Sequence, residues 1–167
     1  MNWASSVIPL KRFASKNFFI FGEVCRLADV LDFIQKDELL SNALALKGGT
    51  AINLTIFNLP RLSVDIDMDF SENVPREEML AIRKQITERI SKYMTAAGYH
   101  LSQKSKTYHA LDSFVYEYQN AGGMKDNLKI EINYMLRCHV LAPVRRTVNL
   151  PWLEQELTVL SVDPLEI

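Results

Sequence analysis

Two short stretches of the chain bring together residue types that can do chemistry. The first, Lys47-Gly48-Gly49-Thr50, contains paired glycines, which let backbone N–H groups approach a ligand closely because no Cβ intervenes. The residues after Thr50 favour a short helix, whose free N–H groups would attract an anion such as phosphate. The second stretch, residues 61–69, alternates apolar residues with serine and aspartate, which is the pattern of a half-buried strand.

The second stretch carries closely spaced carboxylates. Asp65 and Asp67 are two residues apart on the expected strand, so their side chains point the same way, about 7 Å apart along the chain. Two carboxylates placed in this way suit one or two hard divalent cations, Mg²⁺ or Mn²⁺. Such metals bridge the phosphates of a nucleotide and neutralise charge during in-line transfer. We expect Asp69, the third acid, to be solvated or to cap the segment that follows.

A two-metal site usually needs a third carboxylate from a neighbouring strand. Glu131 is the best candidate, because it lies on the polar face of an expected strand between two apolar residues. Arg61 could pair with an acid or hold a phosphate, and both readings stay open. Paired glycines alone are usually a turn, and alternating aspartates are often a solvent face. Their combination is much less common than the separate parts.

The elements that must position these residues can be read from hydrophobic periodicity. Helices are predicted over residues of about 17–35, 50–58 and 76–97. Strands are predicted over residues 43–46, 62–70, 99–104, 113–119, 128–134 and 157–162. The fold class is therefore α/β or α+β, with a mixed β-sheet flanked by helices.

Length and composition indicate one globular domain over residues 1–167, with its core at about 15–162. The chain has 167 residues, of which 48% are hydrophobic and 23% charged, which excludes disorder and coiled coil for the whole. A net charge of −1 gives no global basic field, so any nucleic-acid contact must be local. Two distant cysteines exclude a zinc ribbon. With no signal-peptide order and no long apolar run, we expect a cytoplasmic protein without membrane contact.

The last residues read as the beginning of a helix. Asp163-Pro164-Leu165-Glu166 has an N-cap acid, proline at the first helical position and glutamate three residues after the cap. A helix of a few residues is not stable alone. We therefore expect residues 163–167 to begin a helical region that is missing, through truncation or a shortened gene product.

The two chemical stretches together resemble a known family. Lys47-Gly48-Gly49-Thr50-Ala51-Ile52 and the R-x-S-x-D-I-D stretch from Arg61 to Met68 are similar to the segments of AbiEii/AbiGii toxin-type nucleotidyltransferases. These belong to the DNA polymerase β-like superfamily. A weaker resemblance extends from about residue 15 to the end. The family then continues into a helical region with a conserved lysine and an Arg-Asp-type motif, which lie beyond Ile167.

The resemblance implies a role for each matched residue. The phosphates of an incoming NTP would be held or supported by Lys47, Gly48, Gly49, Thr50, Arg61 and Ser63. Asp65 and Asp67 would bind Mg²⁺ (or Mn²⁺). Glu131 would complete the metal site or act as general base on the acceptor hydroxyl.

The implied reaction is transfer of a nucleoside monophosphate from an NTP to an acceptor, with release of pyrophosphate. The resemblance suggests a tRNA or other RNA 3′ end, or a protein hydroxyl, as acceptor. It also implies a toxin of a toxin–antitoxin or abortive-infection system, opposed by a cognate antitoxin.

Two other functions stay open at this point. The chain could be a catalytically incomplete nucleotide-binding module, which a missing C-terminal region favours and the intact Asp65 and Asp67 oppose. A DxD glycosyltransferase would explain the acids but not the preceding Gly-Gly-Thr.

Overall fold

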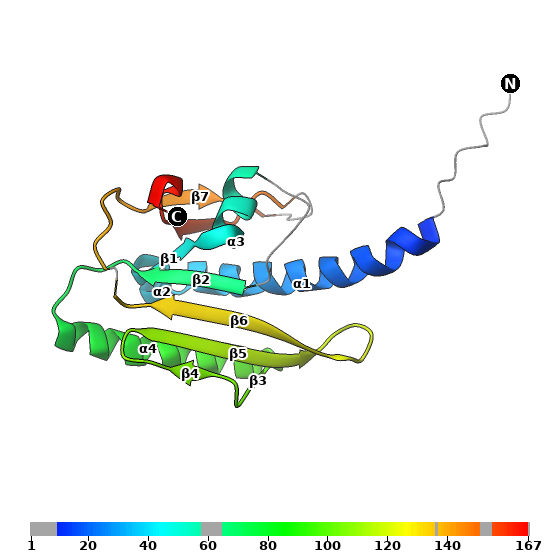
Figure 1. Cartoon of the computed structure of the whole chain (residues 1–167), viewed down its shortest axis with the longest axis horizontal. Helices are drawn as coiled ribbons and strands as arrows, with labels where there is room; N and C mark the ends of the chain where they lie inside the picture. The colour runs from blue at the N-terminus through cyan, green and yellow to red at the C-terminus, as the bar shows by residue number, and fades with distance from the viewer. Residues whose placement is uncertain (1–9, 58–64, 136, 151–154, 167) are drawn as a thin grey trace, which may run out of the picture.

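One mixed sheet, with helices packed on it, forms the body of the molecule (Figure 1). The computed structural model describes residues 10–57, 65–135, 137–150 and 155–166, with side chains from residue 22 onward and Phe57 excepted. Within these residues, eight strands form a sheet of order β3-β5-β6-β2-β1-β8-β7, and β4 also pairs with β5. The predicted fold class, a mixed sheet flanked by helices, is confirmed.

The strands and helices have the following bounds, each set given in chain order. The strands are β1 (Leu44–Lys47), β2 (Asp65–Phe70), β3 (His100–Leu101), β4 (Lys106–Thr107), β5 (Leu111–Gln119), β6 (Lys125–Asn133), β7 (Val144–Thr147) and β8 (Thr158–Ser161). The helices are α1 (Leu10–Lys36), α2 (Glu38–Ala43), α3 (Gly48–Ile52), the π-helix η1 (Asn53–Phe57), α4 (Arg76–Ala96) and the 3-10 helix η2 (Pro164–Glu166).

The core lies between one face of the sheet and the long helices α1 and α4, which both run behind the strands in Figure 1. Alternate residues of β2, namely Ile66, Met68 and Phe70, are buried in this core, as the period-2 pattern predicts. The two helices also contact each other, because the rings of Phe33 and Tyr93 stack with centroids 3.9 Å apart. The opposite face of the sheet is left to the polar residues of the same strands.

The pairing of the central strands decides which polar residues meet. β2 runs antiparallel to β1 and parallel to β6, so it lies between the strand before the glycines and the strand of Glu131. In this register Asp67 stands opposite Lys47 on one side and opposite Glu131 on the other. The third carboxylate is therefore on the strand next to the two aspartates, as predicted.

Several elements differ from the sequence-based predictions. The helix expected over residues 50–58 begins earlier, at Gly48, and continues as the π-helix η1. The strand expected over residues 99–104 shrinks to the two residues of β3. α2, β4 and β7 were not predicted. The start of the strand predicted over 62–70 lies outside the described residues.

The C-terminal segment adopts the turn that its capping residues indicate. The backbone N–H of Leu165 donates to Oδ1 of Asp163 at 3.0 Å, and Pro164–Glu166 form a 3-10 turn. Glu166 then accepts from the backbone N–H of Leu141 and lies 3.1 Å from Nδ1 of His139. This segment is therefore fastened to the loop between β6 and β7. Among the described helices, none combines the length and apolar character that a membrane span needs.

Candidate active site

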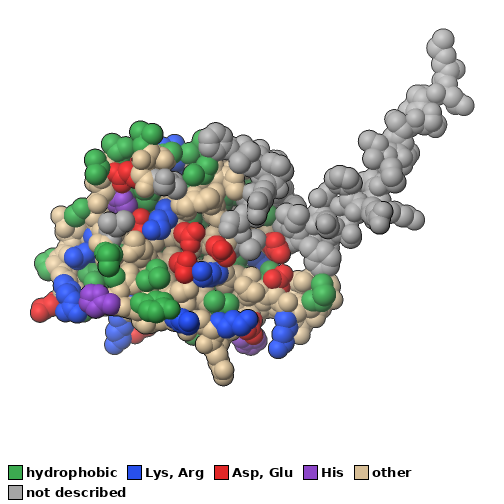
Figure 2. Space-filling view, viewed as in Figure 1, with side chains coloured by type: hydrophobic (Ala, Val, Ile, Leu, Met, Phe, Trp, Pro, Cys, Tyr) green, Lys and Arg blue, Asp and Glu red, His purple; other side chains and the backbone are tan. Residues whose placement is uncertain are grey.

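Acidic and basic side chains gather on the sheet face that points away from α1 and α4. Asp67 of β2 and Glu131 of β6 are paired positions of neighbouring parallel strands. Ser113 of β5 is paired with Glu131 on its far side, and Lys47 of β1 with Asp67. Figure 2 shows red and blue side chains together in the middle of this face. Four adjacent strands thus place these four polar side chains in one row.

At Gly48, the backbone of the glycine turn lies close to this row of polar side chains. Its φ of +72° lies in the left-handed region, and a Cβ built there would stand 3.0 Å from Oδ2 of Asp67. Gly49 has no such neighbour, since nothing lies within 4 Å of its Cβ position. Gly48 therefore closely approaches Asp67, while the predicted approach of this turn to a ligand stays a prediction.

Thr50 joins the glycine turn to the acidic strand. Its side chain is fully buried, and its hydroxyl donates to the backbone carbonyl of Asp65 at 2.7 Å. This bond fixes the beginning of α3 against the first residue of β2. The phosphate contact predicted for Thr50 stays a prediction, and so do those of Lys47, Gly48 and Gly49.

Asp69 is not solvated, so the expectation made for it is wrong. The residue is 4% exposed, and its Oδ1 accepts from Nζ of Lys47 at 2.6 Å and from Nδ2 of Asn133 at 3.0 Å. A buried carboxylate needs such partners, because burial of an unpaired charge is costly. The partners come from the strands on either side, so only the sheet register reveals them. The ammonium of Lys47 is therefore held by Asp69 beside the proposed phosphate site.

The carboxylates of the row influence one another. Burial, followed by the negative charges of Glu131 and Asp65, raises the pKa of Asp67. Burial also acts to raise the pKa of Glu131, but hydrogen bonds with Lys129 and Ser113 outweigh it, so that pKa is lowered. Glu131 is therefore ionised at neutral pH, and a bound cation would relieve the repulsion at Asp67.

The donor set fits a hard divalent cation in its chemistry. Asp65, Asp67 and Glu131 offer carboxylate oxygens, the ligands that Mg²⁺ and Mn²⁺ take, and Gly48 leaves the Asp67 carboxylate unobstructed. Across the described part of the chain, however, no three His, Cys, Asp or Glu side chains are drawn together closely enough to hold a metal. Glu131 is paired instead with Lys129, whose Nζ lies 2.9 Å from Oε1. Arg61 and Ser63, the remaining predicted site residues, lie outside the described residues.

Comparison with known proteins assigns the chain to a family. Residues 32–167 match the family described as "Nucleotidyl transferase AbiEii toxin, Type IV TA system". The chain belongs to the AbiEii family. The match includes every predicted site residue, so the resemblance seen in the sequence is confirmed. No curated protein matches the sequence significantly.

A solved structure of another protein has a similar fold. MenT4, a nucleotidyltransferase toxin from Mycobacterium tuberculosis, superposes with a TM-score of 0.54 at 18% sequence identity. The alignment covers 87% of this chain and 49% of MenT4. The chain thus shares the fold of MenT4 and spans about half of its length.

Lys129, which the sequence did not single out, lies beside the candidate site residues. It pairs with Asp65 in the β2–β6 register and forms an ion pair with Glu131 on its own strand. Its hydrogen bond to Glu131, followed by the charges of Glu131, Asp65 and Asp67, raises its pKa against the effect of burial. The signal was present in the sequence, because residues 129 and 131 lie on the same face of one strand.

Proposed function

We propose that this AbiEii chain catalyses transfer of a nucleoside monophosphate from an NTP to an acceptor hydroxyl, with Mg²⁺ or Mn²⁺. The observation that carries the proposal is the pairing of Asp67 with Glu131 on neighbouring parallel strands, next to the left-handed Gly48 turn. Membership of a nucleotidyltransferase toxin family supports this reading of the site. It also favours nucleotidyl transfer over the transfer of a sugar by a DxD enzyme.

Different residues of the chain would bind the cation and the triphosphate. Asp65, Asp67 and Glu131 would hold the cation. When bound, it neutralises charge on the phosphates during the transfer. The backbone of the Gly48–Thr50 turn, with Lys47, Arg61 and Ser63 beside it, would hold and orient the triphosphate. These are contacts that position the α-phosphorus for in-line attack.

As the alternative to holding the cation, Glu131 would act as the proton acceptor. Its lowered pKa keeps the carboxylate ionised at neutral pH, so it can take a proton from the acceptor hydroxyl. The acceptor oxygen then forms its bond to the α-phosphorus while the bond from that phosphorus to pyrophosphate breaks. The nucleoside monophosphate ends on the acceptor, and pyrophosphate leaves.

The proposed biological setting follows from the family. A type IV toxin–antitoxin toxin implies a cognate antitoxin, and we propose a tRNA or other RNA 3′ end, or a protein hydroxyl, as acceptor. We place the reaction in the cytoplasm, where these acceptors are abundant, and abortive infection is the proposed context of the toxicity.

Calorimetric titration with each of the four NTPs, with and without Mg²⁺, tests the proposal. We expect one NTP to bind more tightly in Mg²⁺, and Asp65→Ala and Asp67→Ala to abolish that difference while circular dichroism shows an unchanged fold. The preferred NTP, radiolabelled, is then incubated with tRNA and with protein acceptors. Metal-independent binding, or binding that survives both substitutions, would overturn the proposal.

A second candidate is a nucleotide-binding module that does not complete the reaction alone. The observation in its favour is that the chain spans 49% of MenT4. The two candidates separate in the same experiment, because the module would bind NTP and Mg²⁺ without labelling any acceptor.

A further inference from the structure

Lys129 lies beside the three carboxylates of the proposed metal site. The paired positions Asp65–Lys129 and Asp67–Glu131 form a block of four side chains on two adjacent strands. Three of the four are carboxylates, and Lys129 supplies the positive charge. Its Nζ lies 2.9 Å from Oε1 of Glu131, and the two side chains are 34% and 29% exposed, so this pair is partly shielded from water.

The other nearby ammonium is already engaged. Lys47 is 2.6 Å from Asp69, a buried carboxylate that also accepts from Asn133. The charge of Lys47 also acts on Asp67 and Glu131, but its direct partner is Asp69, whereas the direct partner of Lys129 is Glu131 itself. Burial, followed by Glu131 and Asp65, raises the pKa of Asp67, and the positive charges of Lys129 and Lys47 oppose this rise.

The geometry points to Lys129 as an internal counter-cation that a divalent metal must displace from Glu131 before the three carboxylates can close around the metal. This inference rests on the proposed function and concerns the same site. It accounts for the position of Glu131, whose Oε1 lies 2.9 Å from Nζ of Lys129. The displaced ammonium then lies beside the metal site, where the triphosphate brings negative charge. Lys129 therefore links metal binding to nucleotide binding.

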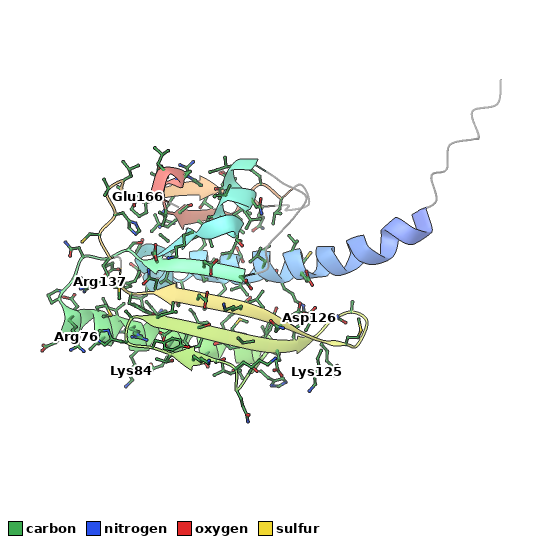
Figure 3. All side chains as sticks on the ribbon, viewed as in Figure 1. Arg76, Lys84, Lys125, Asp126, Arg137 and Glu166 are labelled. Atoms are coloured by element: carbon green, nitrogen blue, oxygen red, sulfur yellow. The ribbon has the colours of Figure 1, made fainter. Side chains whose placement is uncertain are left out.

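The test compares charge-removing and charge-keeping variants. Lys129→Met and Lys129→Arg are prepared with Lys125→Met as the matched control. Lys125 lies on the same face of the same strand, four residues away, and Figure 3 shows it near the β5–β6 turn. The control removes the same net charge without touching the carboxylate block. Mn²⁺ and Mg²⁺ binding, without nucleotide, is measured by calorimetry and by Mn²⁺ electron paramagnetic resonance.

We expect Lys129→Met to bind Mn²⁺ about two- to fivefold more tightly than the wild type, the range that loss of one competing, partly exposed ion pair allows. Without metal, the melting temperature of Lys129→Met falls below that of the wild type, because the carboxylates lose their counter-charge. Adding Mg²⁺ raises the melting temperature of this variant by more than it raises that of the wild type. NTP binding in saturating Mg²⁺ weakens. Lys129→Arg and Lys125→Met behave like the wild type in each measurement.

Two results would overturn the inference, and they are distinguishable. If the wild type binds metal but Lys129→Met binds it equally or less tightly, Lys129 does not compete with the metal and the proposed function still stands. If neither the wild type nor Lys129→Met binds metal or NTP, the proposed function itself fails and the inference fails with it.

Discussion

Asp67 is half-buried and faces two other carboxylates, so its charge is unfavourable in the folded protein without metal. Burial and the charges of Glu131 and Asp65 raise its pKa on folding. Such a group contributes stability below its unfolded pKa of about 4, and this contribution is lost as the pH rises through the higher folded pKa. At neutral pH the ionised Asp67 therefore lowers the free energy of unfolding.

Asp67→Asn should consequently have opposite effects on stability and on binding. We expect the metal-free variant to have a higher urea midpoint than the wild type at neutral pH, with the difference disappearing in acid, where Asp67 is protonated in both states. The same variant should lose Mg²⁺-dependent NTP binding. A variant less stable than the wild type at neutral pH would contradict the assigned electrostatics.

Gly48 and Gly49 have different structural roles, which alanine substitution can distinguish. Gly48→Ala forces a side chain into the left-handed region, at a cost of about 1–2 kcal/mol, and places Cβ 3.0 Å from Oδ2 of Asp67. Gly49→Ala meets nothing within 4 Å and lies in α3, where alanine is favoured by up to about 1 kcal/mol. Urea denaturation should show a lower free energy of unfolding for Gly48→Ala and no decrease for Gly49→Ala. Equal decreases in the two variants would contradict the different roles assigned to Gly48 and Gly49.

At the scale of the elements, α4 is fastened to the sheet by Arg83. Its guanidinium binds both carboxylate oxygens of Asp112, at 2.9 and 2.6 Å, and donates to the carbonyls of His109 and Tyr108. It also lies 4.7 Å from the ring centroid of Tyr134. The side chain of Asp112 is 2% exposed, so these contacts hold a buried ion pair between α4 and β5.

Removal of one member of that pair should be strongly destabilising. Asp112→Ala leaves the guanidinium of Arg83 without its counter-charge, and we expect the free energy of unfolding to fall by about 3–5 kcal/mol. Asp32→Ala is the control, because it breaks the exposed Asp32–Lys36 pair on α1 at a cost of about 0.3–0.5 kcal/mol. Chemical denaturation checks both values, and similar losses in the two variants would contradict this assignment.

The sequence predicts an element well when that element is long or strictly alternating. The helix of residues 76–97 and the alternation of β2 both appear as expected, because each buries one regular face. The short α2 is different, since its beginning depends on one cap in which Asp37 accepts from the backbone N–H of Leu40 at 3.1 Å. The partners of Asp69 depend on strand register, which no local pattern records.

At the scale of the molecule, one hydrophobic core connects helices and strands from most of the chain. It includes Leu31 of α1, Leu46 of β1, Ile90 of α4, Ile130 of β6 and Val159 of β8. We therefore expect residues 1–167 to unfold as the single domain predicted from the sequence. Scanning calorimetry should give one transition whose calorimetric and van't Hoff enthalpies agree. Two resolved transitions would show that the chain contains separate folding units.

The order of the strands also has a consequence for how the molecule is made. Asp67 meets Glu131 only across a parallel pairing between strands distant in the chain, and β1 pairs with β8, at Leu46 and Ser161. Contacts of this range close late in folding, because the chain between them must first be ordered. A polypeptide still growing on the ribosome, with β6 not yet synthesised, has no assembled carboxylate site. The proposed carboxylate site would therefore form only after β6 has left the ribosome.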